Sequence, residues 1–140
     1  MSPEAALAGY SKRPLAAKLG LKAGQRIAIY NAPAGYATAL GELPAGVILL
    51  DESGSSLDLV HFFSDSRVEL STQFPRLKAQ LAPTGKLWIS WPKRAANIST
   101  DLDENRVREI GLANGLVDVK VAAIDQVWSG LQFVCRLKDR

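Results

Sequence analysis

The sequence has few of the residues on which metal and catalytic sites usually depend. It contains one cysteine, Cys135, and one histidine, His61, among 140 residues. A single cysteine excludes an intramolecular disulfide and a cysteine cluster for zinc, and the apolar alternation around Cys135 predicts a buried thiol. A single histidine excludes a site with two histidine ligands and leaves one candidate base for a catalytic triad. We therefore expect no metal site.

Two common functional motifs are also missing. The chain has neither the Gly-x-x-x-x-Gly-Lys-Ser/Thr loop that holds phosphates nor the Gly-x-Ser-x-Gly turn that presents a nucleophilic serine. No apolar run approaches the ~20 residues that cross a bilayer. Met1 to Tyr10 lacks the basic segment and apolar run of a secretory signal. These absences predict a cytoplasmic protein without membrane contact.

The charge pattern gives no strong signal for nucleic acid. The net charge is +3, and the Lys and Arg residues are scattered from Lys12 to Arg140 and interleaved with acids. A specific nucleic-acid binder more often gathers its cations on one face or beside aromatic platforms. A solvated surface is the favoured interpretation.

The composition predicts one globular α/β domain over residues 1–140, with residues 1–22 as an N-terminal arm and short helix. Hydrophobic residues make up 47% of the chain and charged residues 22%, and this length suits a single core. The strand and helix signals alternate along the sequence. Helices are expected at 11–19, 33–40, 66 onward and 101–114, and strands at 27–30, 47–50, 57–63, 86–91, 117–124 and 131–137.

Local signals mark several helix ends. Ser11 is a candidate N-cap for the first helix, and Gly20 stands where a left-handed C-cap belongs. Ser66 and Glu69 have the spacing of a capping box, which predicts that a helix starts at Ser66. Pro75 inside that helix predicts a kink or a break near Gln73. Either Thr100 or Asp101 is expected to cap the last long helix.

The strand patterns predict a mostly parallel, three-layer sheet with an antiparallel C-terminal hairpin. The runs at 47–50 and 57–63 are almost continuously apolar, as parallel strands covered by helices on both faces require. Residues 51–56 are too few to hold a helix and another strand. We expect the spatial order two, one, three, four, six, five, with Trp128-Ser129-Gly130 near the hairpin turn and an exposed, alternating edge at 117–124.

The carboxyl ends of parallel strands meet at one sheet edge, so the candidate ligand-binding residues come from segments far apart in sequence. They are Asn31, Asp51, Ser64, Trp91 and Lys93. The expected ligand site lies between the loops after strands one and three, where the chain connections leave in opposite directions. Lys93 would supply a cation and Trp91 an apolar wall.

Several of these residues have a second interpretation. Asn31 caps the following helix or donates to a ligand, and Asp51 is a solvated loop residue or an acceptor for ribose hydroxyls. His61 is a hydrogen-bonded core residue or faces the cleft. Trp88 and Trp91 point to opposite faces of one strand, and Trp88 is the one expected in the core.

Two segments resemble the class I S-adenosylmethionine-dependent methyltransferases. They are Leu21-Lys22-Ala23-Gly24-Gln25-Arg26-Ile27, which leads into the first strand, and Leu81-Ala82-Pro83-Thr84-Gly85-Lys86-Leu87-Trp88-Ile89, which looks like the Pro-Gly-Gly turn and strand after that family's fourth helix. The resemblance implies a Rossmann-like fold.

The chain also resembles a small, uncharacterised bacterial family catalogued as a domain of unknown function. The similar segments are Gly9-Tyr10-Ser11, Pro14-Leu15, Asn31-Ala32-Pro33, Ser90-Trp91-Pro92-Lys93 and Trp128-Ser129-Gly130-Leu131. This likeness implies a fold and no activity.

The methyltransferase comparison also shows which cofactor-binding residues differ. Ile29 stands where the family has an acid, and Asn31 and Pro33 stand at two glycine positions, so that only Gly35 remains. Pro33 also lacks an N–H that could bind an anion. We expect no cofactor, and S-adenosylmethionine should bind weakly or not at all.

Three functional hypotheses remain open from the sequence. The first is a degenerate methyltransferase-like module that binds a small molecule or a protein partner without catalysis. The second is an enzyme, either a divergent methyltransferase or one that uses Asp51, His61 or Lys93. The third is a purely structural or dimerising protein that uses the exposed edge of the final hairpin.

Overall fold

The computed structural model describes residues 14–140 and contains a six-stranded mixed sheet. The spatial order is β2-β1-β3-β4-β6-β5, as the sequence predicts. Strands β2, β1, β3 and β4 run parallel, and β6 runs antiparallel to both β4 and β5. The strand bounds are β1 (Arg26–Tyr30), β2 (Ile48–Leu49), β3 (Leu57–Phe63), β4 (Leu81–Pro92), β5 (Leu116–Ala123) and β6 (Trp128–Cys135). As expected, residues 50–56 hold no further strand.

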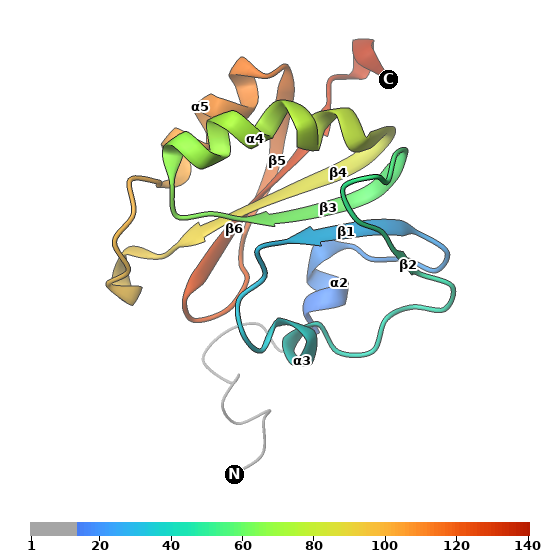
Figure 1. Ribbon diagram of the computed structural model, residues 1–140, viewed down its shortest axis with the longest axis horizontal. Helices are drawn as coiled ribbons and strands as arrows, with labels where there is room; N and C mark the ends of the chain where they lie inside the picture. Colours follow the sequence, from blue (N-terminus) through green and yellow to red (C-terminus); the bar gives the residue numbers. More distant parts are fainter. Residues whose placement is uncertain (1–13) are drawn as a thin grey trace.

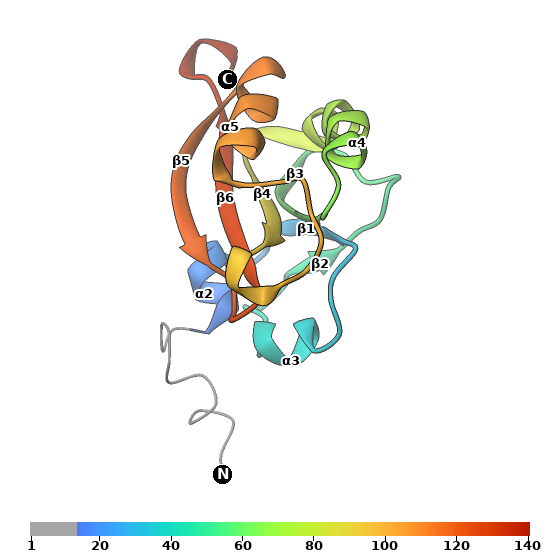
Figure 2. The ribbon, with the colours of Figure 1, turned by 90° about the vertical axis from the view of Figure 1, so that its left-hand side faces the viewer.

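Helices cover both faces of the sheet, which confirms the predicted three-layer arrangement. Two short helices, α2 (Leu15–Leu19) and α3 (Tyr36–Leu40), lie on one face. Two longer helices, α4 (Arg67–Gln80) and α5 (Glu104–Ala113), lie on the other. Figures 1 and 2 show the two pairs on opposite sides of the sheet in both views. Single 3-10 turns, η1 (Arg94–Ala96) and η2 (Leu137–Asp139), follow β4 and β6.

The face that carries α4 and α5 is closed by apolar packing. Leu70, Phe74 and Leu77 follow helical spacing along α4 and are fully buried. Phe74 packs edge-on against Phe133 of β6, with ring centroids 5.6 Å apart. Gly111 of α5 lies directly over the Phe133 ring, and a Cβ at this position would overlap that ring. The missing side chain is therefore what allows α5 to approach the sheet closely.

The opposite core mixes apolar and polar groups. Leu19 of α2, Trp88 of β4 and Tyr36 of α3 are buried in it. The indole Nε1 of Trp88 donates a hydrogen bond to the Leu19 carbonyl at 3.0 Å. Gly20 ends α2 in the left-handed conformation (φ 86°), as expected for its C-cap. The proposed cap Ser11 lies outside the described residues, and Pro14 occupies the N-cap position.

The start of α4 confirms half of the predicted capping box. Ser66 Oγ accepts a hydrogen bond from the Glu69 amide at 3.1 Å. The Glu69 carboxylate, however, accepts from Ser64 Oγ at 2.6 Å, so it does not reach back to the Ser66 amide. Of the predicted kink or break at Pro75, the break does not occur, since α4 continues through this residue to Gln80. Packing along the Leu70–Leu77 side therefore outweighs the local loss of one backbone donor.

The last long helix starts later than predicted. Asp103 is the N-cap of α5, and its Oδ1 accepts from the Arg106 amide at 2.8 Å. Thr100 and Asp101, the expected caps, serve other segments: Thr100 Oγ1 donates to the Asp65 carbonyl, and Asp101 Oδ1 accepts from the Arg67 amide. These two residues therefore join the α5 entry loop to the start of α4.

Both edge strands differ from the prediction. Strand β2 is only Ile48–Leu49, and these side chains are 47% and 57% exposed, because the short loop after β2 brings no helix over them. Strand β5 is an edge, as expected, but its pairing with β6 slips between Asp118 and Lys120, so the expected alternation breaks at Val119. Trp128, Ser129 and Gly130 lie within β6, and the turn falls at 124–127. Within residues 14–140, no helix has the length and apolar character needed to span a bilayer.

Candidate functional site

Three pockets open along the carboxyl edge of the parallel strands. The switch-point pocket, of about 450 Å³, lies between the ends of β1 and β3 and α4. It is lined by Tyr30, Asn31, Glu52, Phe62, Glu69, Gln73 and Arg76. The Ser64 pocket, of about 230 Å³, is lined by Asn31, Phe63, Ser64, Asp65, Glu69 and Trp128. The β4 pocket, of about 440 Å³, is lined by Trp91, Pro92, Lys93, Arg94, Ile98, Thr100, Leu102, Asp103, Glu104, Arg106 and Ser129.

Asn31, like Glu69, lines both of the first two pockets. It follows β1 in the left-handed conformation (φ 59°), where it takes a backbone shape that glycine adopts most readily and that asparagine tolerates. Its Nδ2 donates to the Phe63 carbonyl at the end of β3, at 3.0 Å. The capping interpretation is wrong, because α3 begins after Gly35, which stands at its N-cap without a side-chain hydrogen bond. Asn31 instead ties the ends of two adjacent strands together.

Ser64 is buried beneath the edge, and its hydroxyl is already engaged. Its Oγ donates to Glu69 Oε1 at 2.6 Å and accepts from the Ser66 amide at 3.1 Å. The backbone amide of Ser64 donates to the Ser90 carbonyl, which holds the ends of β3 and β4 together. Ser64 therefore positions the Glu69 carboxylate between the two pockets.

The wall of the switch-point pocket on α4 is organised by Tyr30. The Tyr30 hydroxyl donates to Gln80 Oε1 at 2.8 Å, and the Arg76 guanidinium carbon lies 5.0 Å from the Tyr30 ring centroid. Arg76 Nε donates to Gln73 Oε1 at 2.9 Å, while its Nη1 is buried without a partner. The cation of this pocket is thus held against an aromatic ring, where cation–π attraction stabilises it.

Gln80 also holds the loop after β2 against α4. Its Nε2 donates to the carbonyls of Asp51, Glu52 and Gly54 at 3.2, 3.3 and 3.0 Å, and so holds this loop beside α4. Glu52 lines the switch-point pocket as a result. The sequence gives little signal for Gln80, because one glutamine near a helix end has no distinctive pattern. Glu52 could have been proposed as the neighbour of Asp51.

Asp51 itself is placed differently from the expected ribose acceptor. It is exposed, and its Oδ1 accepts from the hydroxyl and the amide of Ser53 at 2.7 and 2.9 Å. These two hydrogen bonds, the side-chain one first, lower the pKa of the Asp51 carboxyl. Its carboxylate stabilises the turn after β2, and Asp51 lines none of the three pockets.

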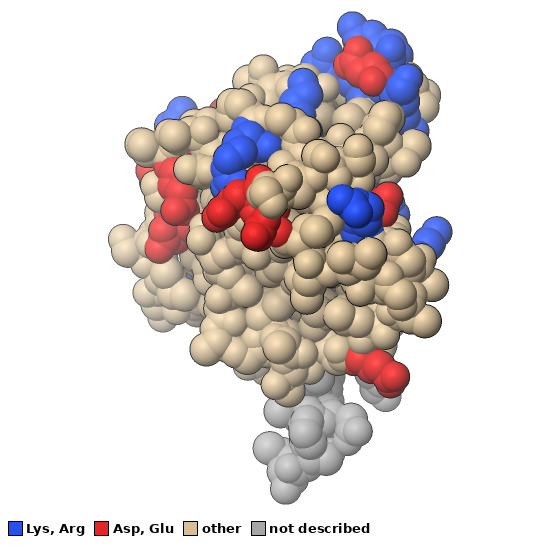
Figure 3. All heavy atoms as spheres, turned by 45° about the vertical axis from the view of Figure 1, so that its right-hand side comes forward, with Lys and Arg blue, Asp and Glu red and all other residues tan. Residues whose placement is uncertain are grey.

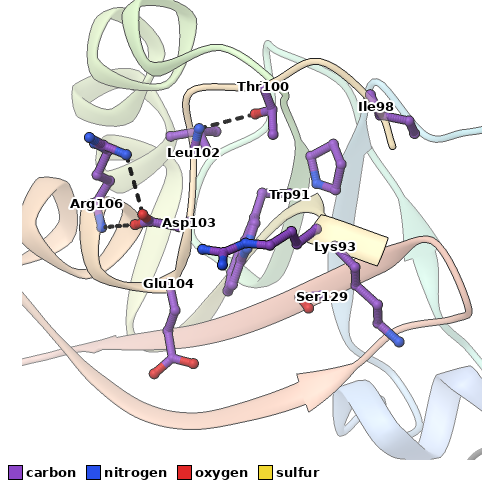
Figure 4. Close-up of a pocket in the computed structure, with 11 residues that line it drawn as sticks. Trp91, Lys93, Ile98, Thr100, Leu102, Asp103, Glu104, Arg106 and Ser129 are labelled. Carbon is purple, nitrogen blue, oxygen red and sulfur yellow. Dashed lines mark hydrogen bonds and ion pairs between the residues drawn. The ribbon is translucent and has the colours of Figure 1, made fainter. Parts of the chain in front are cut away.

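Trp91 and Lys93 lie in the β4 pocket, apart from Asn31 and Ser64. Trp91 is 5% exposed and packs into the core beneath α4 and α5, while Trp88 is buried on the opposite face, so both tryptophans are core residues. Figure 4 shows the Lys93 amine pointing away from Asp103 and Arg106, which pair with each other at 3.2 Å. The structure therefore divides the five predicted site residues among two pocket regions and one exposed turn.

His61 is a core residue. It is fully buried in β3, where its Nδ1 is 2.8 Å from the Tyr36 hydroxyl and its Nε2 is 2.7 Å from Ser90 Oγ. Burial lowers the pKa of His61 to about 3 and raises the pKa of Tyr36. His61 is thus neutral at physiological pH, faces the α3 side of the sheet and lines none of the three pockets. Within residues 14–140, no group of three His, Cys, Asp or Glu side chains is placed to hold a metal ion.

Comparisons with known proteins identify the fold. No family model matches the chain, and no curated protein matches it in sequence. Among solved structures, a TehB-like SAM-dependent methyltransferase from Corynebacterium glutamicum superposes with a TM-score of 0.56 at 12% identity, covering 92% of this chain and 91% of that one.

Two further solved structures agree with this result. A SAM-dependent methyltransferase from Aquifex aeolicus gives a TM-score of 0.56 at 15% identity, over 84% of this chain and 85% of that one. Magnesium protoporphyrin IX methyltransferase (ChlM) from Synechocystis PCC 6803, with bound SAH, gives 0.53 at 15% identity, over 87% and 78%. The chain therefore has a methyltransferase-like, Rossmann-like α/β fold.

Proposed function

We propose that this protein is a non-catalytic binding module that takes a small polar ligand in the switch-point pocket. The observation that carries the proposal is Asn31, whose side chain fastens the ends of β1 and β3 while the pocket beside it stays open. In open α/β sheets ligands bind at this crevice. The enzyme hypothesis loses one of its candidate groups, because His61 is buried with both ring nitrogens engaged.

The charges around the pocket favour a hydroxyl-bearing ligand over an anion. Glu52 and Glu69 present two carboxylates, which accept hydrogen bonds from hydroxyl groups, whereas the one cation, Arg76, lies against Tyr30. Helix α3 has five residues and starts after Gly35, so it forms no anion site next to Asn31. A nucleoside such as adenosine has the expected chemistry: a diol for the carboxylates and a flat base for the Tyr30 wall.

A matched pair of variants tests this assignment. In a thermal-shift panel of adenosine, S-adenosylmethionine, S-adenosylhomocysteine, ATP and NAD, we expect adenosine to stabilise most; a ligand at 100 times its Kd adds about 2.7 kcal/mol. Glu52→Gln should weaken adenosine binding about tenfold, because it replaces a charged acceptor with a neutral one. Lys93→Ala should change that affinity less than twofold and change stability by no more than ~0.5 kcal/mol. Equal effects of the two variants would exclude the switch-point pocket.

S-adenosylmethionine is expected to bind weakly or not at all. Ile29, Asn31 and Pro33 replace the acid and two glycines of the methyltransferase pattern, and no cofactor is expected in that pose. Isothermal titration gives a direct measurement. A Kd in the low micromolar range, competed by S-adenosylhomocysteine, would contradict this proposal.

That result would favour the alternative function, a divergent methyltransferase. Its support is the fold, together with neighbours solved with bound SAM or SAH, and Glu52 beside Asn31 at the end of the first two strands. In that case Glu52→Gln should weaken S-adenosylhomocysteine as well as adenosine. Lys93→Ala again serves as the control.

Four broader features stay predictions. Three of them are a protein partner in place of a small molecule, a cytoplasmic location, and membership of the bacterial family of unknown function. Homodimerisation along β5 is the fourth, and the slipped pairing at Val119 opposes it, because a bulge twists an edge away from a partner strand. Light scattering at rising protein concentration tests the dimer.

Charged side chains on the face shown in Figure 3 are of mixed sign. Lysines and arginines lie beside acids in its upper half, and the lower half is mainly uncharged. On this face the distribution agrees with the expected weak nucleic-acid signal, because an electrostatic footprint requires cations gathered together.

A further inference from the structure

A second polar cluster lies on the α2 side of the sheet, away from the carboxyl-edge pockets. The antiparallel register places Trp88 of β4, Gln132 of β6 and Lys120 of β5 opposite one another in a single row. Residues opposite one another share a face, so the three side chains are neighbours on the face that carries α2. Lys86, two residues before Trp88, occupies the next row of that face.

Gln132 is the unusual member of this row. It is 4% exposed, and its Nε2 is buried without a hydrogen-bond partner. The Lys120 amine lies 5.6 Å from the Trp88 ring centroid. Because β6 runs between β4 and β5, the Lys120 side chain must pass over Gln132 to reach that ring. A buried amide donor left without a partner is costly, and the flexible Lys120 side chain lies across this one.

Lys86 interacts electrostatically with both Lys22 and Lys120. The Lys86 amine lies next to Gly20, 3.2 Å from where a Cβ on that residue would be. Partial burial, and then the charges of Lys22 and Lys120, lower the pKa of Lys86. Within residues 14–140, no carboxylate forms an ion pair with Lys22, Lys86 or Lys120. The cluster thus combines three ammonium groups with one unpaired amide donor.

We propose that Lys22, Lys86, Lys120 and Gln132 form a binding site for a phosphate-type oxyanion, the lysine site. Each ammonium donates up to three hydrogen bonds, and a phosphate group offers several charged acceptors. When Lys120 turns from Trp88 toward the anion, the Gln132 amide is uncovered and gains an acceptor. The anion also offsets the mutual repulsion of the lysines. This site is independent of the switch-point pocket and of the function proposed for it.

The test is a ¹H–¹⁵N NMR titration of the full chain with pyrophosphate at constant ionic strength. We expect the Gln132 side-chain amide signals, assigned by their loss in Gln132→Met, to shift together with the backbone amides of Gly20 and Lys22. Lys86→Gln should weaken pyrophosphate about tenfold, as loss of a charged donor predicts. Its thermal stability should be unchanged or higher because one like charge is removed, so the loss of binding will not reflect unfolding.

Arg67→Gln is the matched control, since it removes the same charge from α4 on the opposite face of the sheet. It should weaken pyrophosphate less than twofold. Parallel titrations with inorganic phosphate and ADP distinguish a free oxyanion from a nucleotide as the source of the phosphate, and a saturable Gln132 shift with either supports the site. Equal weakening by Lys86→Gln and Arg67→Gln, or a Gln132 amide that does not respond, would overturn the proposal.

Discussion

The two faces of the sheet are built on different principles. On one face, α4 and α5 contribute 14 and 10 residues, and their buried side chains meet β-strand residues in almost purely apolar contact. On the other face, α2 and α3 contribute five residues each. That thinner layer covers His61, Ser90, Gln132 and the Trp88 indole.

The difference shows how helix length determines what a face can bury. A long amphipathic helix supplies enough apolar surface to cover a sheet without polar contacts. A five-residue helix does not, so the polar groups beneath it must find partners in the protein. His61 and Trp88 do so, through Tyr36, Ser90 and Leu19, whereas Gln132 Nε2 does not. Of the two buried side-chain donors without a partner within residues 14–140, Gln132 Nε2 lies on the thin face, where the lysine site is proposed, and Arg76 Nη1 lies on α4 beside Tyr30.

Overpacking the face that carries α4 and α5 should cause the greatest loss of unfolding free energy. Gly111→Leu would place a side chain in the space of the Phe133 ring and push α5 off the sheet. We expect a loss of about 3 kcal/mol in unfolding free energy, measured by urea denaturation, because an overpacked core cannot relax fully. Glu109→Ala, at an exposed position of the same helix, should cost less than ~0.5 kcal/mol. A stable Gly111→Leu protein would show that α5 is not closely packed.

A smaller effect is expected from the polar network on the thin face. His61→Leu removes both hydrogen bonds and leaves the Tyr36 and Ser90 hydroxyls buried without partners. We expect a loss of about 2 kcal/mol at pH 8, because each stranded hydroxyl carries a desolvation cost. Adding Tyr36→Phe and Ser90→Ala to His61→Leu should recover part of this loss. If the triple variant is less stable than His61→Leu, the two hydroxyls stabilise the fold by packing alone and carry no desolvation cost.

The low pKa of the same residue also makes the stability of this face depend on pH. The pKa of His61 is about 3 in the fold and near 6.5 when unfolded, so the neutral ring favours folding. This stability is fully present above pH 6.5 and is lost as the unfolded chain takes up a proton and the pH falls toward 3. The advantage of wild type over His61→Leu should therefore shrink by about 2 kcal/mol between pH 8 and pH 5. An unchanged advantage over that range would show that the ring is already protonated or solvated in the fold.

Several signals that act within a few residues predict the structure correctly. Ser66 caps α4 because its partner amide, on Glu69, is only three residues away. Gly20 ends α2 for an equally local reason, its freedom to adopt positive φ. The strand order also followed from local lengths and apolar runs, because the connection after β2 is too short to hold a further strand and parallel strands need covered faces.

Signals that depend on distant partners could not be read in this way. Thr100 and Asp101 have the right chemistry for caps, but they bind Asp65 and Arg67 on another element, which leaves the cap of α5 to Asp103. Pro75 predicts a break only if the helix is judged alone. Asn31 looks like a cap until the end of β3 provides the Phe63 carbonyl.

The candidate site also has features set by the sequence and features set by distant contacts. The sequence determined that Asn31, Ser64, Trp91 and Lys93 end their strands at one edge, because the side of a parallel sheet on which strands end follows from chain direction. Only the tertiary structure decided that Glu52 and not Asp51 lines the switch-point pocket, that Lys93 lies in a different pocket from Asn31, and that His61 is buried in the core. In a parallel sheet the chain direction alone fixes the edge at which each strand ends, whereas pocket membership depends on side chains that meet across long stretches of chain.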